Sequence, residues 1–231
     1  MTMPAHAQLS VDRLWVDFEP GAAHRSDIVI RNESPDRYYI TVTPSEITSP
    51  GTDQEARVEQ ADPEALGLLV TPNRLVVDPG GMRSIRVVAL DETVTTDRIY
   101  RVKITPQVGE LKSTVGESGK GIAIKVLAAY DILVTARPAR AKPELTVTRE
   151  NGELVIRNVG NSNTLLYEGR ACTGDTVPKA EGTAIPDGCT DLGARRIYPG
   201  NEWKLPLPTA QAKVRFKQRS LASSDPKEVD F

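Results

Sequence analysis

The sequence predicts an all-β protein. Short runs in which apolar and polar residues alternate recur along the chain, and clusters of Gly, Pro, Asn and Asp separate them. Almost nothing before residue 120 has the periodicity of a helix. With 231 residues, of which 39% are hydrophobic, the chain can bury the cores of two ordinary domains. This pattern is typical of immunoglobulin-like β-sandwiches, and we expect two of them in tandem.

Six short strands are expected before residue 107. Turn-forming residues mark their ends at 19–22, 32–36 and 78–81. Residues 49–63 are polar and are expected to form a surface loop. In order, the expected strands are 9–18, 26–32, 38–43, 66–77 with a break at Pro72, 82–90 and 97–106.

Residues 120–138 form an unusually long, apolar stretch between the two expected sets of strands. This stretch is roughly three times as long as a typical strand of ~5–6 residues, and its β-branched residues favour a strand over a helix. Two interpretations stay open: a core strand with a second element fused to it, or a strand kept partly apolar to complete the core of another protein. Alternation places one continuous apolar stripe on a single face, made of Ile122, Ile124, Val126, Ala128, Tyr130, Ile132 and Val134.

A basic, proline-bearing linker at 138–143 separates the expected domains, 8–137 and 144–231. Asn151-Gly152 is typical of a hairpin turn, and the charged tail after Ser220 is expected to fray. The second domain is expected to contain strands at 144–148, 153–157, 164–168, 196–198, 202–206 and 213–217.

Two features predict export from the cytoplasm. Residues 1–7 end in Ala5-His6-Ala7, the small-residue pattern at the end of a signal peptide, so they are interpreted as a leader remnant. Cys172 and Cys189 are the only cysteines, and a disulfide between them would close a Gly- and Pro-rich loop and add ~3 kcal/mol. The alternative is two separate buried thiols.

Several functions find no support in the sequence. The net charge of −2 gives no reason to expect nucleic acid or an anionic membrane as a partner, and no stretch approaches the ~20 apolar residues of a membrane span. A cysteine pair without a nearby histidine is too small a ligand set for a metal. Residues 116–121 depart from the phosphate-binding loop pattern and lead into an expected strand. We therefore expect no enzyme, metal or cofactor.

Four segments in order resemble the periplasmic chaperones of the chaperone–usher pilus pathway. They are the opening strand and turn at 9–21, the proline–arginine–glycine segment at 71–88, the strand at 97–106, and the end of the long stretch at 133–138. The resemblance implies a periplasmic protein that binds pilus or fimbrial subunits by donating a β-strand and passes them to an outer-membrane usher. It implies that Ile122, Ile124, Val126 and Ala128 fill the groove of the bound pilin.

The chain departs from this family at one site. Many members hold the C-terminal carboxylate of the pilin with an Arg on the first strand and a Lys on the long strand, and these positions are Trp15 and Leu133 here. Arg13 and Lys125 are the nearest substitutes. Arg137 matches a basic residue at the family's domain junction.

Asp97 is the expected partner of Arg137. An exposed donor strand also makes a self-capped homodimer plausible. The alternative function is a two-domain extracytoplasmic structural or adhesion protein whose long strand is wholly internal.

Overall fold

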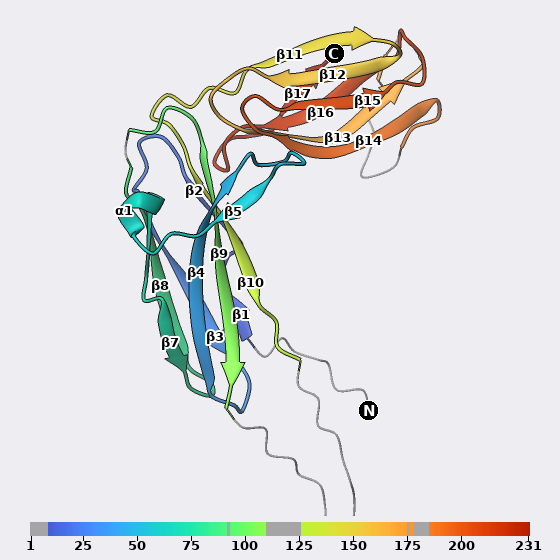
Figure 1. The fold of residues 1–231 in the computed structure, drawn as a ribbon. Helices are drawn as coiled ribbons and strands as arrows, with labels where there is room; N and C mark the ends of the chain where they lie inside the picture. The colour runs from blue at the N-terminus through green and yellow to red at the C-terminus, as the bar shows by residue number, and fades with distance from the viewer. Residues whose placement is uncertain (1–8, 92, 110–125, 175, 178–184) are drawn as a thin grey trace, which may run out of the picture.

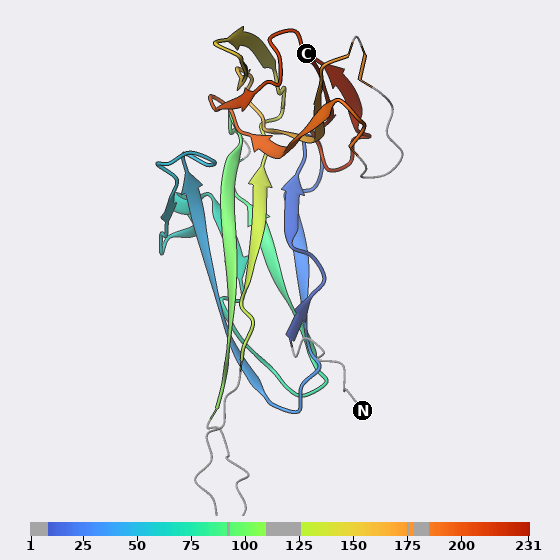
Figure 2. The same cartoon turned by 90° about the vertical axis from the view of Figure 1, so that its right-hand side faces the viewer.

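The structure is a computed structural model that describes residues 9–91, 93–109, 126–174, 176–177 and 185–231. It confirms the prediction of two β-sandwiches in tandem (Figure 1). The strands of the second sandwich run across one end of the first, and Figure 2 looks onto one face of the first sandwich, where β4 (Tyr38–Thr48), β9 (Arg98–Val108), β10 (Tyr130–Ala136) and β2 (Trp15–Phe18) lie side by side.

The first sandwich packs an antiparallel sheet against a mixed one. The antiparallel sheet has the order β1 (Leu9–Val11), β3 (Arg25–Asn32), β8 (Met82–Ala89) and β6 (Leu68–Thr71). The mixed sheet has the order β2 (Trp15–Phe18), β10 (Tyr130–Ala136), β9 (Arg98–Val108), β4 (Tyr38–Thr48) and β5 (Ala56–Val58), and β7 (Arg74–Val77) also pairs with β4.

Alternating residues from both sheets form one core. Its largest fully buried side chains include Tyr38, Tyr100, Ile28, Ile85 and Ile132. Removing such aliphatic side chains from water stabilises the fold by ~1.5–3 kcal/mol each.

The expectation of one strand over 9–18 is wrong. β1 pairs with β3 in one sheet, whereas β2 pairs with β10 in the other. The chain changes sheets after Asp12, whose carboxylate accepts the Val29 N–H at 2.8 Å. Leu14 is consequently 53% exposed and does not share the buried face of Val16 and Phe18.

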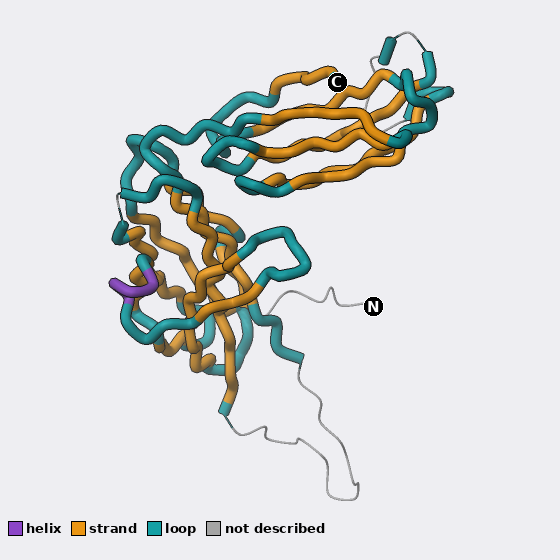
Figure 3. Tube along the Cα trace, turned by 45° about the horizontal axis from the view of Figure 1, so that its top comes forward, coloured by secondary structure: helices purple, strands orange, loops and turns teal. Residues whose placement is uncertain are grey.

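The expectation of a surface loop over 49–63 is only partly right, because the segment lies at the surface but is not loop throughout. It contains β5, and its end begins a short helix, α1 (Pro63–Leu66). Asp62 caps this helix by accepting the Glu64 N–H, and Gly67 ends it with φ +76°, which favours glycine. Figure 3 shows the β4–β5 hairpin reaching towards the second sandwich, where Asn201 Nδ2 donates to the Pro50 carbonyl at 2.7 Å.

The second sandwich has a three-stranded and a four-stranded sheet. The first has the order β11 (Leu145–Glu150), β12 (Glu153–Asn158) and β15 (Glu202–Pro206). The second has the order β14 (Cys189–Ile197), β13 (Thr164–Cys172), β16 (Lys213–Arg219) and β17 (Lys227–Asp230). Trp203 and Phe216 meet in the core with ring centroids 5.5 Å apart.

Two predictions for this domain are confirmed and two are wrong. Asn151 and Gly152 have positive φ in the hairpin between β11 and β12, and Cys172 forms a disulfide with Cys189. The tail does not fray, since β17 pairs with β16. The strand expected at 196–198 begins at Cys189, because it pairs with β13 from the disulfide onwards.

Candidate functional site

The long apolar stretch forms a shorter strand than expected. β10 begins at Tyr130, and residues 126–129 form no strand, so the expectation of a continuous strand over 120–138 is wrong there. If the register of β10 and β9 continued, Ala128 would face Pro106, which has no N–H to donate. Ile122, Ile124 and Lys125 lie outside the described residues.

The apolar stripe passes from the core to the solvent within this stretch. Ile132 and Val134 are fully buried, and Tyr130 is half-buried. Val126 is 83% exposed, and Ala128 is exposed as well. Among the described residues, the stripe therefore supplies the core only from Tyr130 onwards, and Val126 and Ala128 are presented to the solvent.

One edge of β10 is open beside these exposed residues. β2 pairs in parallel with β10 only from Leu133 onwards, where the Leu133 N–H donates to the Leu14 carbonyl at 3.0 Å. Because strand residues alternate, the backbone of Asp131 faces the same side as that of Leu133. No described strand pairs with Tyr130–Ile132 on that side, although the Asp131 carbonyl accepts a 3.4 Å bond from the Arg101 side chain.

Arg137 lies at the junction of the domains, immediately after β10. Its side chain is 1% exposed, and it forms a bidentate pair with Asp17 through bonds of 2.6 and 2.8 Å. Its third nitrogen donates to Ser162 Oγ of the second domain at 2.7 Å. Burial alone would lower the pKa of Arg137, but the bonds to Asp17 raise it above its usual range.

Asp97 joins the same junction. The structure brings it within 3.7 Å of Arg137, but Asp17 is the main partner of that arginine. One carboxylate oxygen of Asp97 accepts the Asn163 N–H at 2.6 Å, and the other has no partner among the described residues. Burial raises the pKa of Asp97, and the bonds from Asn163 oppose that rise.

A cavity of about 260 Å³ lies between the two sandwiches, next to this junction. Trp15 and Leu133, the two positions where the resemblance implies basic residues, are register partners on β2 and β10 and line the cavity together. Trp15 is 64% exposed. The second domain contributes Arg196 and Arg219 to the opposite wall.

Of the other described candidates, Arg137 also lines this cavity, whereas Arg13 and Asp97 do not. Arg13 bonds Asp12 at 2.9 Å and Ser26 at 3.2 Å. Sequence reasoning missed Asp17, Arg196 and Arg219. Of these three, only Asp17 could have been predicted from the sequence, because strand alternation places it on the same face as Trp15.

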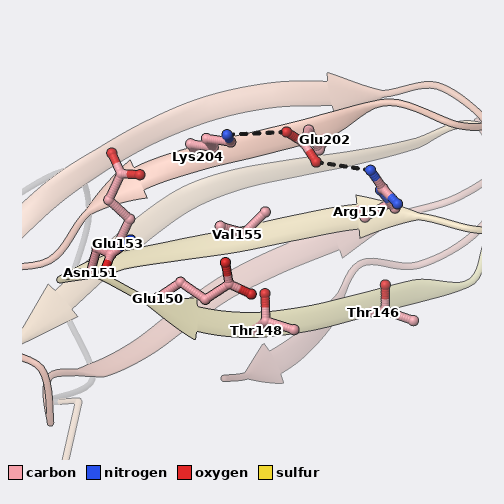
Figure 4. A pocket seen from close by; sticks show the side chains of 9 residues that line it. All are labelled: Thr146, Thr148, Glu150, Asn151, Glu153, Val155, Arg157, Glu202 and Lys204. Atoms are coloured by element: carbon pink, nitrogen blue, oxygen red, sulfur yellow. Dashed lines mark hydrogen bonds and ion pairs between the residues drawn. The ribbon is translucent and has the colours of Figure 1, made fainter.

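A second, larger depression of about 400 Å³ is polar and open. It lies over the outer face of β11, β12 and β15 (Figure 4), where Glu202 bridges Arg157 at 3.1 Å and Lys204 at 3.4 Å. These three charged side chains form ion pairs with one another at the surface. The interdomain cavity has a buried network and two cations with no ion pair to any described residue, so it is the better candidate for a binding site.

Neither a metal cluster nor a membrane helix occurs in the part of the chain that the structure describes. No group of three or more His, Cys, Asp or Glu side chains there could hold a metal ion. None of the described helices is long and apolar enough to cross a membrane.

The tandem arrangement of two β-sandwiches defines the fold class of this chain, and several solved structures share it. The chain shares the fold of the class 5 fimbriae chaperone CfaA with a TM-score of 0.72, at 20% identity and over 96% of this chain and 97% of that one. A chain from a chaperone–tip adhesin complex of CFA/I fimbriae biogenesis gives 0.68 at 20% identity, over 97% and 98% of the two chains. A chain of the Salmonella enterica SafA pilin–SafB chaperone complex gives 0.60 at 12% identity, over 99% of both. The structure thus has the fold of fimbrial chaperones, as the sequence resemblance implied.

Two curated relatives, both from Escherichia coli, are similar in sequence. One is a CS1 fimbrial subunit, which is 24% identical over 180 residues that span 76% of this chain and 71% of that protein. The other is a CFA/I fimbrial subunit, which is 25% identical over 160 residues that span 68% of this chain and 65% of that protein. No family model matches the sequence.

Proposed function

We propose that this protein is a periplasmic chaperone that binds unfinished fimbrial subunits by adding a strand to them and delivers them to an outer-membrane usher. The observation that carries the proposal is the open edge of β10 at Tyr130–Ile132, next to the exposed side chains of Val126 and Ala128. Strand addition of this kind is an established mode for chaperone–pilin complexes. The shared fold of fimbrial chaperones supports it.

The physical reason for such a chaperone is the instability of an incomplete sandwich. A pilin that lacks a strand exposes an unpaired edge and an apolar groove, and both promote aggregation. In the proposed complex, the edge of β10 satisfies the backbone groups and the stripe fills the groove. Each large aliphatic side chain buried this way contributes ~1.5–3 kcal/mol before the cost of ordering is subtracted.

Co-purification from the periplasm tests the proposal. The protein is co-expressed with each small secreted protein encoded beside its gene, and the expected result is a stoichiometric complex with a pilin that is degraded when expressed alone. Val126→Asp should abolish capture because it places a charge in the apolar groove. Val159→Asp, at a second-domain valine that is 51% exposed, is the matched control and should retain capture.

Hydrogen exchange separates this function from the alternative of a structural or adhesion protein. The Asp131 amide should exchange quickly in the free monomer and slowly in the complex. A stable monomer in which this amide is protected without any partner would favour an internal strand and contradict the proposal. Without a pilin, the same edge is expected to pair with a second copy, and the resulting homodimer should dissociate when the pilin is added.

A further inference from the structure

The hairpin formed by the end of β4 and by β5, residues 47–58, connects the open strand edge with the second domain, and we call it the arm. In the mixed sheet, β9 and β4 separate β10 from β5. Arg57 on β5 nevertheless donates two hydrogen bonds to the Asp131 carboxylate on β10, one of them at 3.2 Å. The arm therefore bends over the outer face of the sheet, in the direction of the second sandwich (Figure 3).

Two isoleucines on this outer face are buried, although they belong to neither hydrophobic core. Ile47 on β4 and Ile99 on β9 are register partners and are only 6% and 3% exposed. Alternation with the core residue Tyr100 places both side chains on the outer face of the sheet. Arg57 is the register partner of Ile47, so the arm starts directly beside this apolar pair. The cover over the two isoleucines consequently comes from the arm and the second domain.

The tip of the arm is held by the second domain. Asn201 Nδ2 donates to the Pro50 carbonyl at 2.7 Å, and the Arg195 side chain donates to the Gly51 carbonyl at 3.2 Å. Gly51 has a φ of +74°, and a Cβ at this position would lie 3.1 Å from the Tyr198 ring. Because β5 has only three residues, the hairpin would be marginally stable by itself, and these contacts fix its position.

The start of β10 is the part of the strand that needs such support. Residues 126–129 form no strand, and among the described strands residues 130–132 pair with β9 alone. A strand end with a neighbour on one side only tends to fray. Ordering the backbone of one residue during binding lowers an equilibrium constant by about tenfold. A contact that already holds Asp131 in the free protein therefore favours the addition of a strand to this edge.

We infer that Arg57 is a positioning residue, which holds Asp131 and with it the open edge of β10 in place for strand addition; this role rests on the proposed chaperone function. A planar guanidinium that bonds both carboxylate oxygens fixes orientation as well as distance. Lys103 is the register partner of Asp131 on β9, but it forms no ion pair with any described residue. Asp131 is thus held from the arm, and the arm is held by the second domain.

The first test measures backbone order at residues 130–132 in the free monomer of the full chain, by NMR relaxation of the amides. The order parameter should be about 0.85 in the wild type and fall towards about 0.6 in Arg57→Gln. Arg57→Lys keeps a cation and should stay near the wild type. Asp131→Arg should lose the order too, and its combination with Arg57→Asp should restore it, because the swap rebuilds the ion pair.

Arg86→Gln is the matched control, since Arg86 forms an equally bidentate and exposed pair with Asp27 on the opposite sheet, and it should leave this order unchanged. Neither exposed pair adds much to global stability, so both variants should remain folded. Asn201→Ala frees the tip of the arm and should lower the order at residues 130–132 from the other domain. Unchanged order in Arg57→Gln, an equal fall in Arg86→Gln, or no recovery in the charge swap would overturn the inference.

The second test measures the affinity for a pilin that co-purifies with the wild type. Arg57→Gln should weaken this binding by about tenfold, the effect of ordering roughly one residue, and Arg86→Gln should not change it. If the wild type and Arg57→Gln bind the pilin equally, the positioning role is wrong and the chaperone function stands. If the order falls as expected but the wild type captures no pilin, Arg57 does hold the edge and the chaperone function is wrong.

Discussion

Asp17→Asn should destabilise the protein far more than the loss of an ordinary ion pair. Asp17 accepts two bonds from Arg137, whose side chain is 1% exposed. An asparagine can accept only one of those bonds, and its NH2 group opposes the other donor. The substitution therefore leaves a buried cation without its main counter-charge.

The magnitude follows from the geometry. Two unit charges about 4 Å apart attract by ~4 kcal/mol at an effective dielectric constant of about 20. Breaking a buried pair by removing one partner typically costs ~3–5 kcal/mol. Asp97, 3.7 Å from Arg137, retains part of the attraction, so we expect a loss of about 3 kcal/mol in the free energy of unfolding.

Urea unfolding at neutral pH measures this loss, and the chain carries one tryptophan in each sandwich, Trp15 and Trp203, as reporters. The control is Asp27→Asn, which breaks an equally bidentate pair with Arg86 whose side chains are 52% and 47% exposed. The control should lose no more than about 1 kcal/mol. A loss below about 1 kcal/mol for Asp17→Asn, or equal losses for both variants, would refute the argument.

Three further substitutions have definite expected outcomes. Tyr100→Phe should stabilise the protein by up to ~1 kcal/mol, because the buried Tyr100 hydroxyl has no partner among the described residues. Burial raises the pKa of Tyr100, so the wild type should lose stability as the pH rises above about 10 and the variant should lose less; the same pH profile for both would contradict this. Replacing Cys172 and Cys189 by Ala should cost about 3 kcal/mol in chemical unfolding, and an unchanged midpoint would contradict the loop-closure argument. Gly160→Ala should cost ~1–3 kcal/mol in thermal melts, because its Cβ would lie 2.2 Å from a linker carbonyl oxygen, whereas Gly109→Ala, with no described atom within 4 Å of its Cβ, should be nearly neutral.

Alternation in the sequence predicted most strands because each sheet buries one face. It works for Ile28 and Ile30, which are both fully buried on β3. Prediction from alternation fails where pairing with a distant strand decides which sheet a segment joins. The chain changes sheets after Asp12, whose carboxylate accepts the N–H of a residue 17 positions away, and no local pattern records that bond.

The tail after Ser220 shows the same limit. Its charged composition predicts fraying, yet Asp230 forms a bidentate pair with Arg215 on the adjacent strand. Phe231 also packs against Phe216, with ring centroids 6.2 Å apart. These contacts exist only once β16 is in place, so local sequence preference cannot reveal them.

The sequence predicted where the candidate site lies, but it did not predict which charged side chains line the site. Comparison with the family pattern singled out Trp15 and Leu133, and the structure places them in register at the cavity. Arg196 and Arg219 are far apart in the sequence and come together only because β14 and β16 flank β13. Each resembles an ordinary surface charge until that pairing is known.

The buried junction and the site are linked by geometry. A buried ion pair contributes little net stability compared with apolar packing, and such pairs can instead fix one arrangement of the elements that they join. In this chain, Arg137 follows directly after β10, whose edge is open, and also bonds Ser162 of the second domain, which contributes Arg196 and Arg219 to the cavity wall. The junction thereby sets the distance between the strand edge and the two arginines. Asp17→Asn should consequently weaken pilin capture even at temperatures where the variant remains folded, and full capture by a folded variant would show that this distance is set elsewhere.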